Sequence, residues 1–208
     1  MGGILRKVEF NMMKSDEIID YINNNGITHW VNSVGGSRSV WFRLEIEKNP
    51  NIITHKPGDV YHQTPMFVAA HHAPLPVSAT GVFCFRSDIR FVLASQIRRN
   101  IYRGNFLKLC HPDQHKFSYE AWLEVIYNHI INWYSDSPID VWFINTDKIP
   151  ENASLLKKQF GVSFDTYQPN LAKNNVAKEL LPYKKQVDKI NELLASLPSC
   201  DMIVKDKN

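Results

Sequence analysis

The stretch ITHWVNSVGGSRSVWFRLEIEKNP, residues 27–50, decides the expected fold. Ile27, Trp30, Val31 and Val34 suit a buried strand, and the turn GGSRS, four small residues and one Arg, follows at positions 35–39. Val40, Trp41 and Leu44 then recur at helical spacing. The stretch therefore predicts a strand, a turn in which glycine permits unusual backbone conformations, and an amphipathic helix.

The turn of this stretch has the features of an anion site. Gly35 and Gly36 allow the backbone to approach a ligand, and Ser37 and Ser39 stand where the first turn of the helix is expected. Backbone N–H groups in a first helical turn lack intrahelical partners and carry partial positive charge, and the Arg38 guanidinium could fork onto an anion. The turn lacks the spacing and the lysine of the ATPase signature GxxxxGK[ST]. The alternative interpretation is a simple strand-to-helix turn that Ser37 or Ser39 caps.

The composition limits the class of protein. A chain of 208 residues suits one domain, here 1–208, and we expect residues 1–13 and 205–208 to be flexible. A net charge of +3 is too small to indicate a nucleic-acid partner, but it suits a small polyanionic ligand.

The cysteines and the apolar segments indicate the compartment. Cys84, Cys110 and Cys200 are an odd number without metal-ligand spacing, which favours a reducing setting over a disulfide framework. The sequence contains no run of about 18 apolar residues, so no membrane span is predicted, and MGGILRKVEF lacks the apolar core of a signal peptide. We therefore expect a cytoplasmic protein without a membrane partner and without a metal.

Short apolar runs alternate with helical patterns along the chain. Strands are expected at residues 27–34, 66–70, 81–85 and 139–144, with a further short one at 51–54. Helices are expected at residues 16–25, 40–48, 89–102, 117–133, 152–160 and 178–197. This alternation predicts an α/β fold, a three-layer sandwich around a central, mainly parallel sheet with a P-loop-like phosphate-binding turn.

Polar clusters follow three of the expected strands. They are residues 35–39, the pair His71 and His72, and the pair Arg86 and Ser87. Ligands of open parallel sheets bind beyond the carboxyl ends of the strands. We therefore expect these three clusters, which are far apart in the sequence, to meet at one edge of the sheet.

The order of these motifs resembles that of the sulfotransferase superfamily, whose members move a sulfuryl group from 3′-phosphoadenosine 5′-phosphosulfate (PAPS) to an acceptor. The resemblance spans roughly residues 27–165. Its four parts are GGSR at 35–38, HAP at 72–74, FCFRSDIRFVLAS at 83–95 and IDVWFINTDKIPENASLLKKQFGV at 139–162.

The resemblance implies a role for each matching residue. The loop Gly35, Gly36, Ser37, Arg38, Ser39 and Val40 would hold the 5′-phosphosulfate, and Arg86 and Ser95 would hold the 3′-phosphate. His72 would be the base that takes the acceptor proton, because an imidazole titrates near neutral pH, with Glu45 as the second candidate. The acceptor would be a hydroxyl or amine of a small molecule or a saccharide, and the spent donor adenosine 3′,5′-bisphosphate.

The chain departs from the superfamily pattern at four positions. Val34, Phe42 and Ala70 stand where many members carry charged residues, and Ser95 follows Arg86 by nine residues instead of eight. Two other functions therefore stay open. One is a small-molecule kinase on a P-loop fold, which would need a Mg²⁺-binding Asp and a Walker Lys. The other is a nucleotide- or anion-binding module without catalytic activity.

Overall fold

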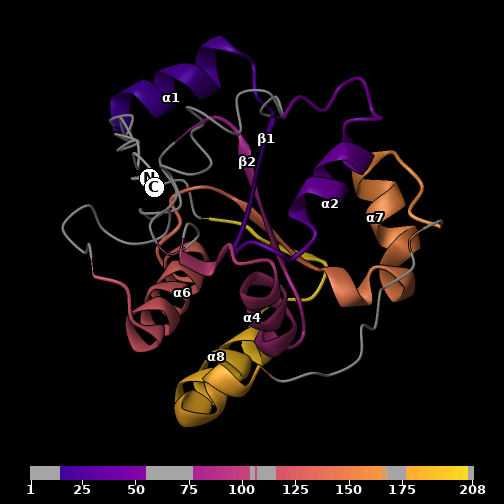
Figure 1. Ribbon diagram of the computed structural model, residues 1–208. Helices are drawn as coiled ribbons and strands as arrows, with labels where there is room; N and C mark the ends of the chain where they lie inside the picture. The colour runs from indigo at the N-terminus through magenta and orange to yellow at the C-terminus, as the bar shows by residue number, and fades with distance from the viewer. Residues whose placement is uncertain are drawn as a thin grey trace, which may run out of the picture.

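A four-stranded sheet forms the centre of the molecule (Figure 1). The computed structural model describes residues 15–54, 77–103, 106, 116–165, 167 and 177–205. The strands lie in the order β1-β2-β3-β4, with bounds β1 His29–Ser33, β2 Thr80–Phe85, β3 Val141–Asn145 and β4 Asp201–Ile203. The first three are parallel and β4 is antiparallel to β3. The predicted α/β class with a mainly parallel sheet is confirmed.

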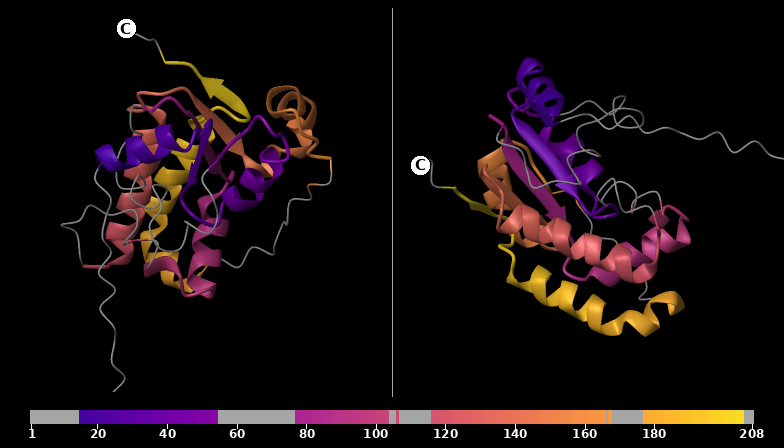
Figure 2. Two further views of the ribbon diagram at one scale, coloured as in Figure 1. Left: turned by 90° about the horizontal axis from the view of Figure 1, so that it is seen from above. Right: turned by 90° about the vertical axis from the view of Figure 1, so that its left-hand side faces the viewer.

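Helices cover both faces of this sheet (Figure 2). The α-helices are α1 Ser15–Asn24, α2 Ser39–Ile46, α4 Ile89–Arg98, α6 Tyr119–Tyr134, α7 Ala153–Phe160 and α8 Lys184–Ser196. The 3₁₀ helices are η3 Thr146–Lys148, η4 Pro150–Asn152 and η5 Lys178–Tyr183. Helices α4, α6 and α8 pack on one face, and α2 and α7 pack on the other.

The period-2 alternation of the strands explains the two separate cores. Trp30 and Phe83 point toward α6, where both rings contact the Trp133 ring at centroid distances of 5.5 and 5.6 Å. Val31 and Val82 belong to the opposite core, with the fully buried aromatic side chains of α2 and α7. Strands buried on both faces are nearly continuous in apolar residues, which is why the runs were recognisable in the sequence.

Two helix starts follow local capping rules. Ser118 accepts a hydrogen bond from the Ala121 N–H at the start of α6, as its position before the apolar stripe predicts. Asp88 caps α4 in the same way by accepting from the Arg90 N–H. Helix α4 ends at Arg98, four residues before the predicted end, because Asn100 takes the left-handed region with φ 53°.

Three secondary-structure predictions were wrong or incomplete. Residues 51–54 do not form a strand. The Ile53 carbonyl accepts from the Thr28 and His29 N–H groups, but the Ile53 N–H bonds the Thr28 hydroxyl, so no strand ladder with β1 follows. The last helical segment begins as the 3₁₀ turn η5, which contains Pro182. Strand β4 was not predicted because three residues are too few to show a period. The predicted strand at residues 66–70 lies outside the described residues.

The strand register brings the carboxyl ends of β1, β2 and β3 side by side. Ser33 is level with Cys84, and Phe85 is level with Asn145. The loop after β1 and the Arg86–Ser87 pair after β2 therefore leave the sheet at the same edge, as predicted. The third predicted cluster, His71 and His72, lies outside the described residues.

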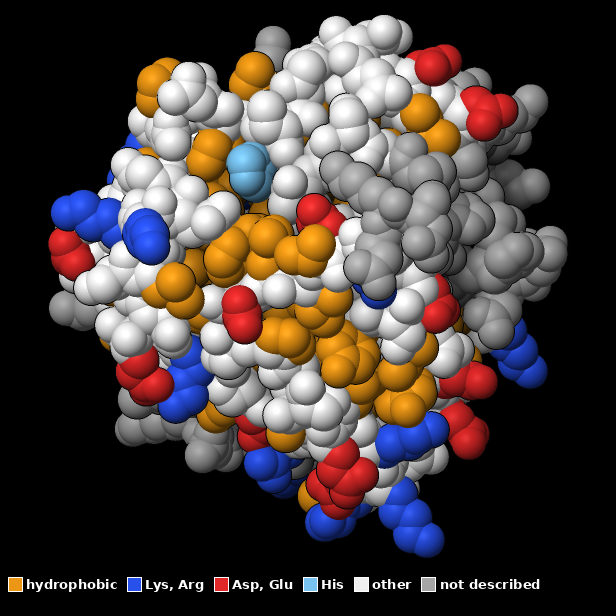
Figure 3. Space-filling model, turned by 180° about the vertical axis from the view of Figure 1, so that it is seen from behind, with side chains coloured by type: hydrophobic (Ala, Val, Ile, Leu, Met, Phe, Trp, Pro, Cys, Tyr) orange, Lys and Arg blue, Asp and Glu red, His pale blue; other side chains and the backbone are white. Residues whose placement is uncertain are grey.

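The surface shows no large field of one charge on the face opposite to the view of Figure 1. Hydrophobic side chains gather in the middle of that face, and basic and acidic side chains are interspersed toward its rim (Figure 3). This mixture agrees with the small net charge of +3. Among the described residues, none of the helices has the length and apolar character needed to cross a bilayer.

Candidate functional site at the carboxyl ends of the strands

The loop at residues 34–38 adopts a conformation that few sequences allow. Gly35 has φ 81°, Gly36 has φ 77° and Arg38 has φ 60°. Glycine adopts such values freely, but arginine does so at a cost of about 1–2 kcal/mol. Backbone strain in a non-glycine residue persists only where the surrounding structure enforces it, and it concentrates at binding sites.

Contacts from two elements hold this loop in place. The buried Gln96 of α4 donates through Nε2 to the carbonyl oxygens of Val34 and Gly35, both at 3.0 Å. Ser33 Oγ accepts from the Gly35 N–H at 3.1 Å and lies 2.9 Å from Ser39 Oγ. The loop carbonyls are thereby engaged with α4.

The start of α2 leaves hydrogen-bonding capacity for an anion. Arg38 is the N-cap residue, and its guanidinium, which has only donors, cannot satisfy the N–H groups of the first turn. Ser37 is completely buried, and its hydroxyl has no hydrogen-bond partner among the described residues. A buried hydroxyl without a partner costs about 1–3 kcal/mol, so native structures normally supply a ligand or water for it. The first-turn N–H groups, which the helix itself leaves unpaired, point to an anion as that ligand.

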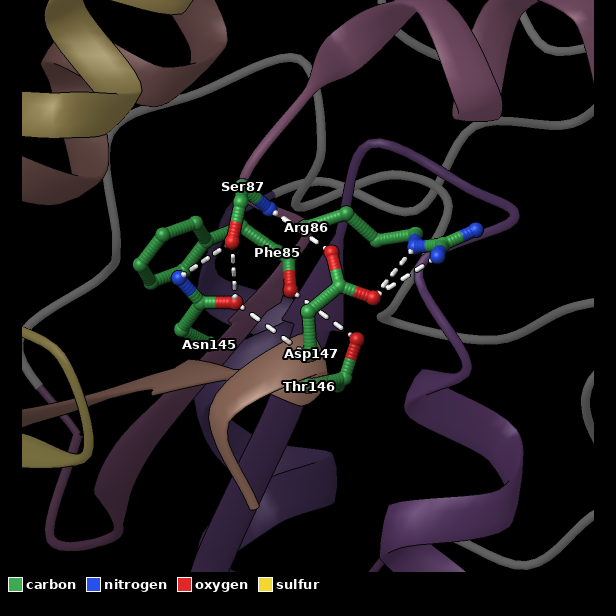
Figure 4. A network of polar contacts seen from close by, with 6 residues as sticks. All are labelled: Phe85, Arg86, Ser87, Asn145, Thr146 and Asp147. Carbon is green, nitrogen blue, oxygen red and sulfur yellow. Dashed lines mark hydrogen bonds and ion pairs between the residues drawn. The ribbon is translucent and has the colours of Figure 1, made fainter. Parts of the chain in front are cut away.

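The neighbouring strand end carries a buried ion pair (Figure 4). Arg86 donates from Nε and Nη2 to Asp147 Oδ1, at 2.9 and 2.7 Å. The two side chains expose only 8% and 13% of their surfaces. The Arg86 guanidinium also lies 4.6 Å from the centroid of the Phe91 ring, so an aromatic face supports it on a further side.

The residues beside the pair fix the position of Asp147. Its Oδ2 accepts from the Ser87 N–H at 3.0 Å, and its own N–H donates to Asn145 Oδ1 at 3.1 Å. Asn145 also donates to the Ser87 hydroxyl at 3.0 Å, and the Thr146 hydroxyl donates to the Phe85 carbonyl. The ends of β2 and β3 are thus joined by one polar network, drawn in Figure 4.

Tyr167 connects the loop after β1 with this network. The Arg38 guanidinium lies 5.2 Å from the centroid of its ring, and the Trp41 ring packs against it at 4.4 Å. Burial raises the pKa of Tyr167, Arg38 opposes that rise, and the Asp147 carboxylate adds to it. Arg38 and Asp147 therefore both lie near the Tyr167 phenol.

Of the remaining predicted site residues, Ser95 and Val40 lie near the loop, whereas Glu45 lies away from it. Ser95 is half-buried on α4, one turn after Val92, whose side chain lies against Gly36, so Ser95 is on the side of the loop. Val40 is 54% exposed in the first turn of α2. Glu45 is paired with Lys48 at 2.5 Å and lies about 9 Å along the α2 axis from Ser39. The predicted base His72 lies outside the described residues.

Several residues of this site were not predicted as functional. Asn145 and Asp147 follow β3 directly, so the rule that ligands bind beyond strand ends would have found them. Gln96 and Tyr167 carry no such signal. One is a polar residue inside an amphipathic helix, and the other stands alone beyond the last predicted strand.

Comparisons with known proteins found no similar protein. No family model, curated protein or solved structure matches the chain. Among the described residues, no group of three His, Cys, Asp or Glu side chains is arranged to hold a metal ion. The function must therefore be argued from the site.

Proposed function

We propose that the protein is a PAPS-dependent sulfotransferase that moves a sulfuryl group to a hydroxyl or amine of a small molecule or saccharide. The observation that carries the proposal is the conformation of the loop at residues 34–38. It combines left-handed Gly35, Gly36 and Arg38 with a buried Ser37 hydroxyl that no described residue hydrogen-bonds, at the N-terminus of α2. These features fit a tetrahedral, oxygen-rich anion.

The proposal assigns the 5′-phosphosulfate to this loop. Ser37, Ser39 and the N–H groups of the first α2 turn donate to its oxygens, and Arg38 adds a charge-assisted donor. PAPS supplies the activated sulfuryl group. Preorganised donors aimed at charge that develops in transfer contribute about 3–4 kcal/mol each to the barrier reduction in comparable enzymes. Rigid support from Gln96 therefore matters as much as the donors themselves.

The second anionic group of the donor is assigned to Arg86 and Ser95. Arg86 follows β2 and so leaves the sheet beside the loop after β1. Helical spacing puts Ser95 on the same side of α4 as Val92, which lies against Gly36. This assignment is supported by the sequence resemblance and by the shared edge of the sheet. The ion pair with Asp147 bears directly on it and is taken up below.

The proposed base is His72. An acceptor hydroxyl must lose its proton as it attacks, and a histidine is suited to that transfer at neutral pH. The second candidate, Glu45, is engaged with Lys48 and lies toward the far end of α2 from the loop. These two features weigh against Glu45 and leave His72 as the residue to test first.

Binding by calorimetry tests the class of ligand. Adenosine 3′,5′-bisphosphate is expected to bind and to raise the melting temperature, and Arg38→Ala is expected to weaken binding by about 10- to 100-fold, the value of a charge-assisted hydrogen bond. ATP with Mg²⁺ serves as the rival ligand. Stabilisation by ATP with Mg²⁺ alone would replace this proposal with a small-molecule kinase.

Transfer from PAPS tests catalysis separately. His72→Ala is expected to lower the transfer rate by about 10²-fold or more while nucleotide binding is kept. His71→Ala is the matched control, and Glu45→Gln tests the second base. If none of these variants lowers the transfer rate while nucleotide binding stays intact, an anion-binding module without catalytic activity is favoured. The engaged states of Glu45 and Arg86 are the observations that support that second function.

A further inference from the structure

Asp147 puts a negative charge where the proposed function requires a positive one. The inference drawn here rests on that proposed function and concerns its specificity. Arg86 is the cation at the end of β2, and Asp147 takes both of its donors on one edge, Nε and Nη2. The formal charge of the pair is zero, whereas an uncompensated Arg86 would carry +1.

The pair is built into the fold and is not a chance surface contact. Each side chain is held from a second direction, Arg86 by the Phe91 ring and Asp147 by the N–H of Ser87. The chain offers a contrast two residues away. Asp88 and Arg90 also form an ion pair, but the Arg90 side chain is 49% exposed and free to move into solvent. Buried, doubly held pairs keep their charges together far better than exposed ones.

The pairing leaves one nitrogen of Arg86 for a ligand. In Figure 4 the remaining guanidinium nitrogen, Nη1, points away from Asp147, and no hydrogen bond engages it among the described residues. A second anionic group that reached this nitrogen would gain one donor. It would also meet the Asp147 carboxylate a few ångströms away, and at that separation the repulsion of like charges offsets most of the attraction by Arg86.

We propose that Asp147 is a specificity-determining residue of the strand-end site: its carboxylate neutralises Arg86, so that a nucleotide gains little affinity from a 3′-phosphate. The wild-type chain then binds its ligand chiefly through the loop at residues 34–38, by the anion at the 5′ position. The site is then expected to discriminate weakly between nucleotides that differ in their second anionic group.

Calorimetry with two nucleotides tests this role. The probes are adenosine 3′,5′-bisphosphate and adenosine 5′-monophosphate, each measured against wild type, Asp147→Asn and the control Asp88→Asn. We expect wild type and the control to bind both probes within about threefold of each other, and Asp147→Asn to bind the bisphosphate about tenfold more tightly than the monophosphate, since one adjacent charge is removed. An unchanged or weakened preference in Asp147→Asn would overturn the role of Asp147.

A double variant keeps the test decisive if Asp147→Asn alone does not fold. Arg86→Gln with Asp147→Asn removes both charges together and leaves no buried charge without a partner. The expected affinity of this variant for the bisphosphate is within about threefold of wild type, because a neutral pair is replaced by a neutral pair. A tenfold loss would mean that Arg86 binds the ligand in spite of Asp147, and the inference would be wrong.

The two proposals fail in different ways. One outcome is that wild type binds the monophosphate, Arg38→Ala abolishes this binding, and Asp147→Asn gains no affinity for the bisphosphate. That outcome would overturn the role of Asp147 and leave the loop as the anion site. Absence of binding of either probe to wild type and to Asp147→Asn would overturn both proposals together.

Discussion

Replacing Arg38 by glycine should separate the stability of the loop from its affinity for an anion. Arg38 is the N-cap of α2 and holds φ 60° and ψ 21°, a region in which a side chain clashes with its own backbone. Arg38→Gly removes that clash, while Arg38→Ala retains it. Both variants remove the guanidinium and its contact with the Tyr167 ring.

The magnitudes follow from the structure. Relief of the left-handed strain stabilises the glycine variant by about 1–2 kcal/mol, and the extra freedom of glycine in the unfolded chain offsets about 0.4–1 kcal/mol of that. Loss of the contact with Tyr167 costs both variants about 0.5–1 kcal/mol. We therefore expect Arg38→Gly to have a free energy of unfolding within about 1 kcal/mol of wild type and to exceed that of Arg38→Ala by about 0–1.6 kcal/mol.

The affinity should fall in both variants regardless of their stability. Loss of one charge-assisted donor weakens the binding of adenosine 3′,5′-bisphosphate by about 10- to 100-fold. The assay is urea denaturation for stability and titration calorimetry at one fixed ionic strength for affinity. Salt is held constant because screening alters every term that involves Arg38.

Asn100 provides the matched control. It is exposed, has φ 53° and lies beyond the end of α4. Asn100→Gly should leave bisphosphate affinity unchanged and should change stability by less than about 1 kcal/mol, since asparagine tolerates this region better than arginine. The reasoning about strain would be refuted if Arg38→Gly were less stable than Arg38→Ala. The reasoning about the site would be refuted if Arg38→Gly bound the bisphosphate like wild type.

Three further outcomes are expected. Gln96→Leu should destabilise the fold by about 1–3 kcal/mol and weaken bisphosphate binding, because the buried Val34 carbonyl and the part-buried Gly35 carbonyl lose their donor. Arg98→Ala, on the exposed side of α4, should change neither property in the same denaturation and calorimetry experiments. Burial raises the pKa of Cys200 to about 11, so its thiol should resist alkylation at pH 8 in the native protein. In a Cys110→Ser background, mass spectrometry should show full labelling only after unfolding, and rapid labelling of the native protein would contradict this. Burial alone would raise the pKa of Asp88, but hydrogen bonds from Arg90 lower it overall, so the charged carboxylate stabilises the fold above the unfolded pKa of about 3.9. The stability advantage of wild type over Asp88→Asn should therefore shrink when urea titrations are moved from pH 6 to pH 3. A constant difference would exclude this linkage.

Local rules predicted the elements that are long or fully buried. The bounds of β2 and β3 were predicted to within two residues, because both faces of a parallel sheet bury apolar side chains and the runs stand out. The cap at Ser118 and the stripe of α6 were equally visible. The secondary-structure errors lie where a segment becomes a strand only if a neighbouring strand pairs with it. Residues 51–54 lie beside the start of β1, yet the Thr28 hydroxyl takes the Ile53 N–H and no ladder forms, whereas β4 pairs with the open edge of β3.

The candidate site shows the same division. The sequence alone determined that GGSRS would sit between a strand and a helix, since glycine, serine and helical spacing act over a few neighbouring residues. It also indicated that Arg86 would follow a neighbouring strand. Only the tertiary structure decided what that charge contacts. Arg86 and Asp147 are 61 residues apart, and their contact depends on the register of β2 against β3, which no local pattern specifies.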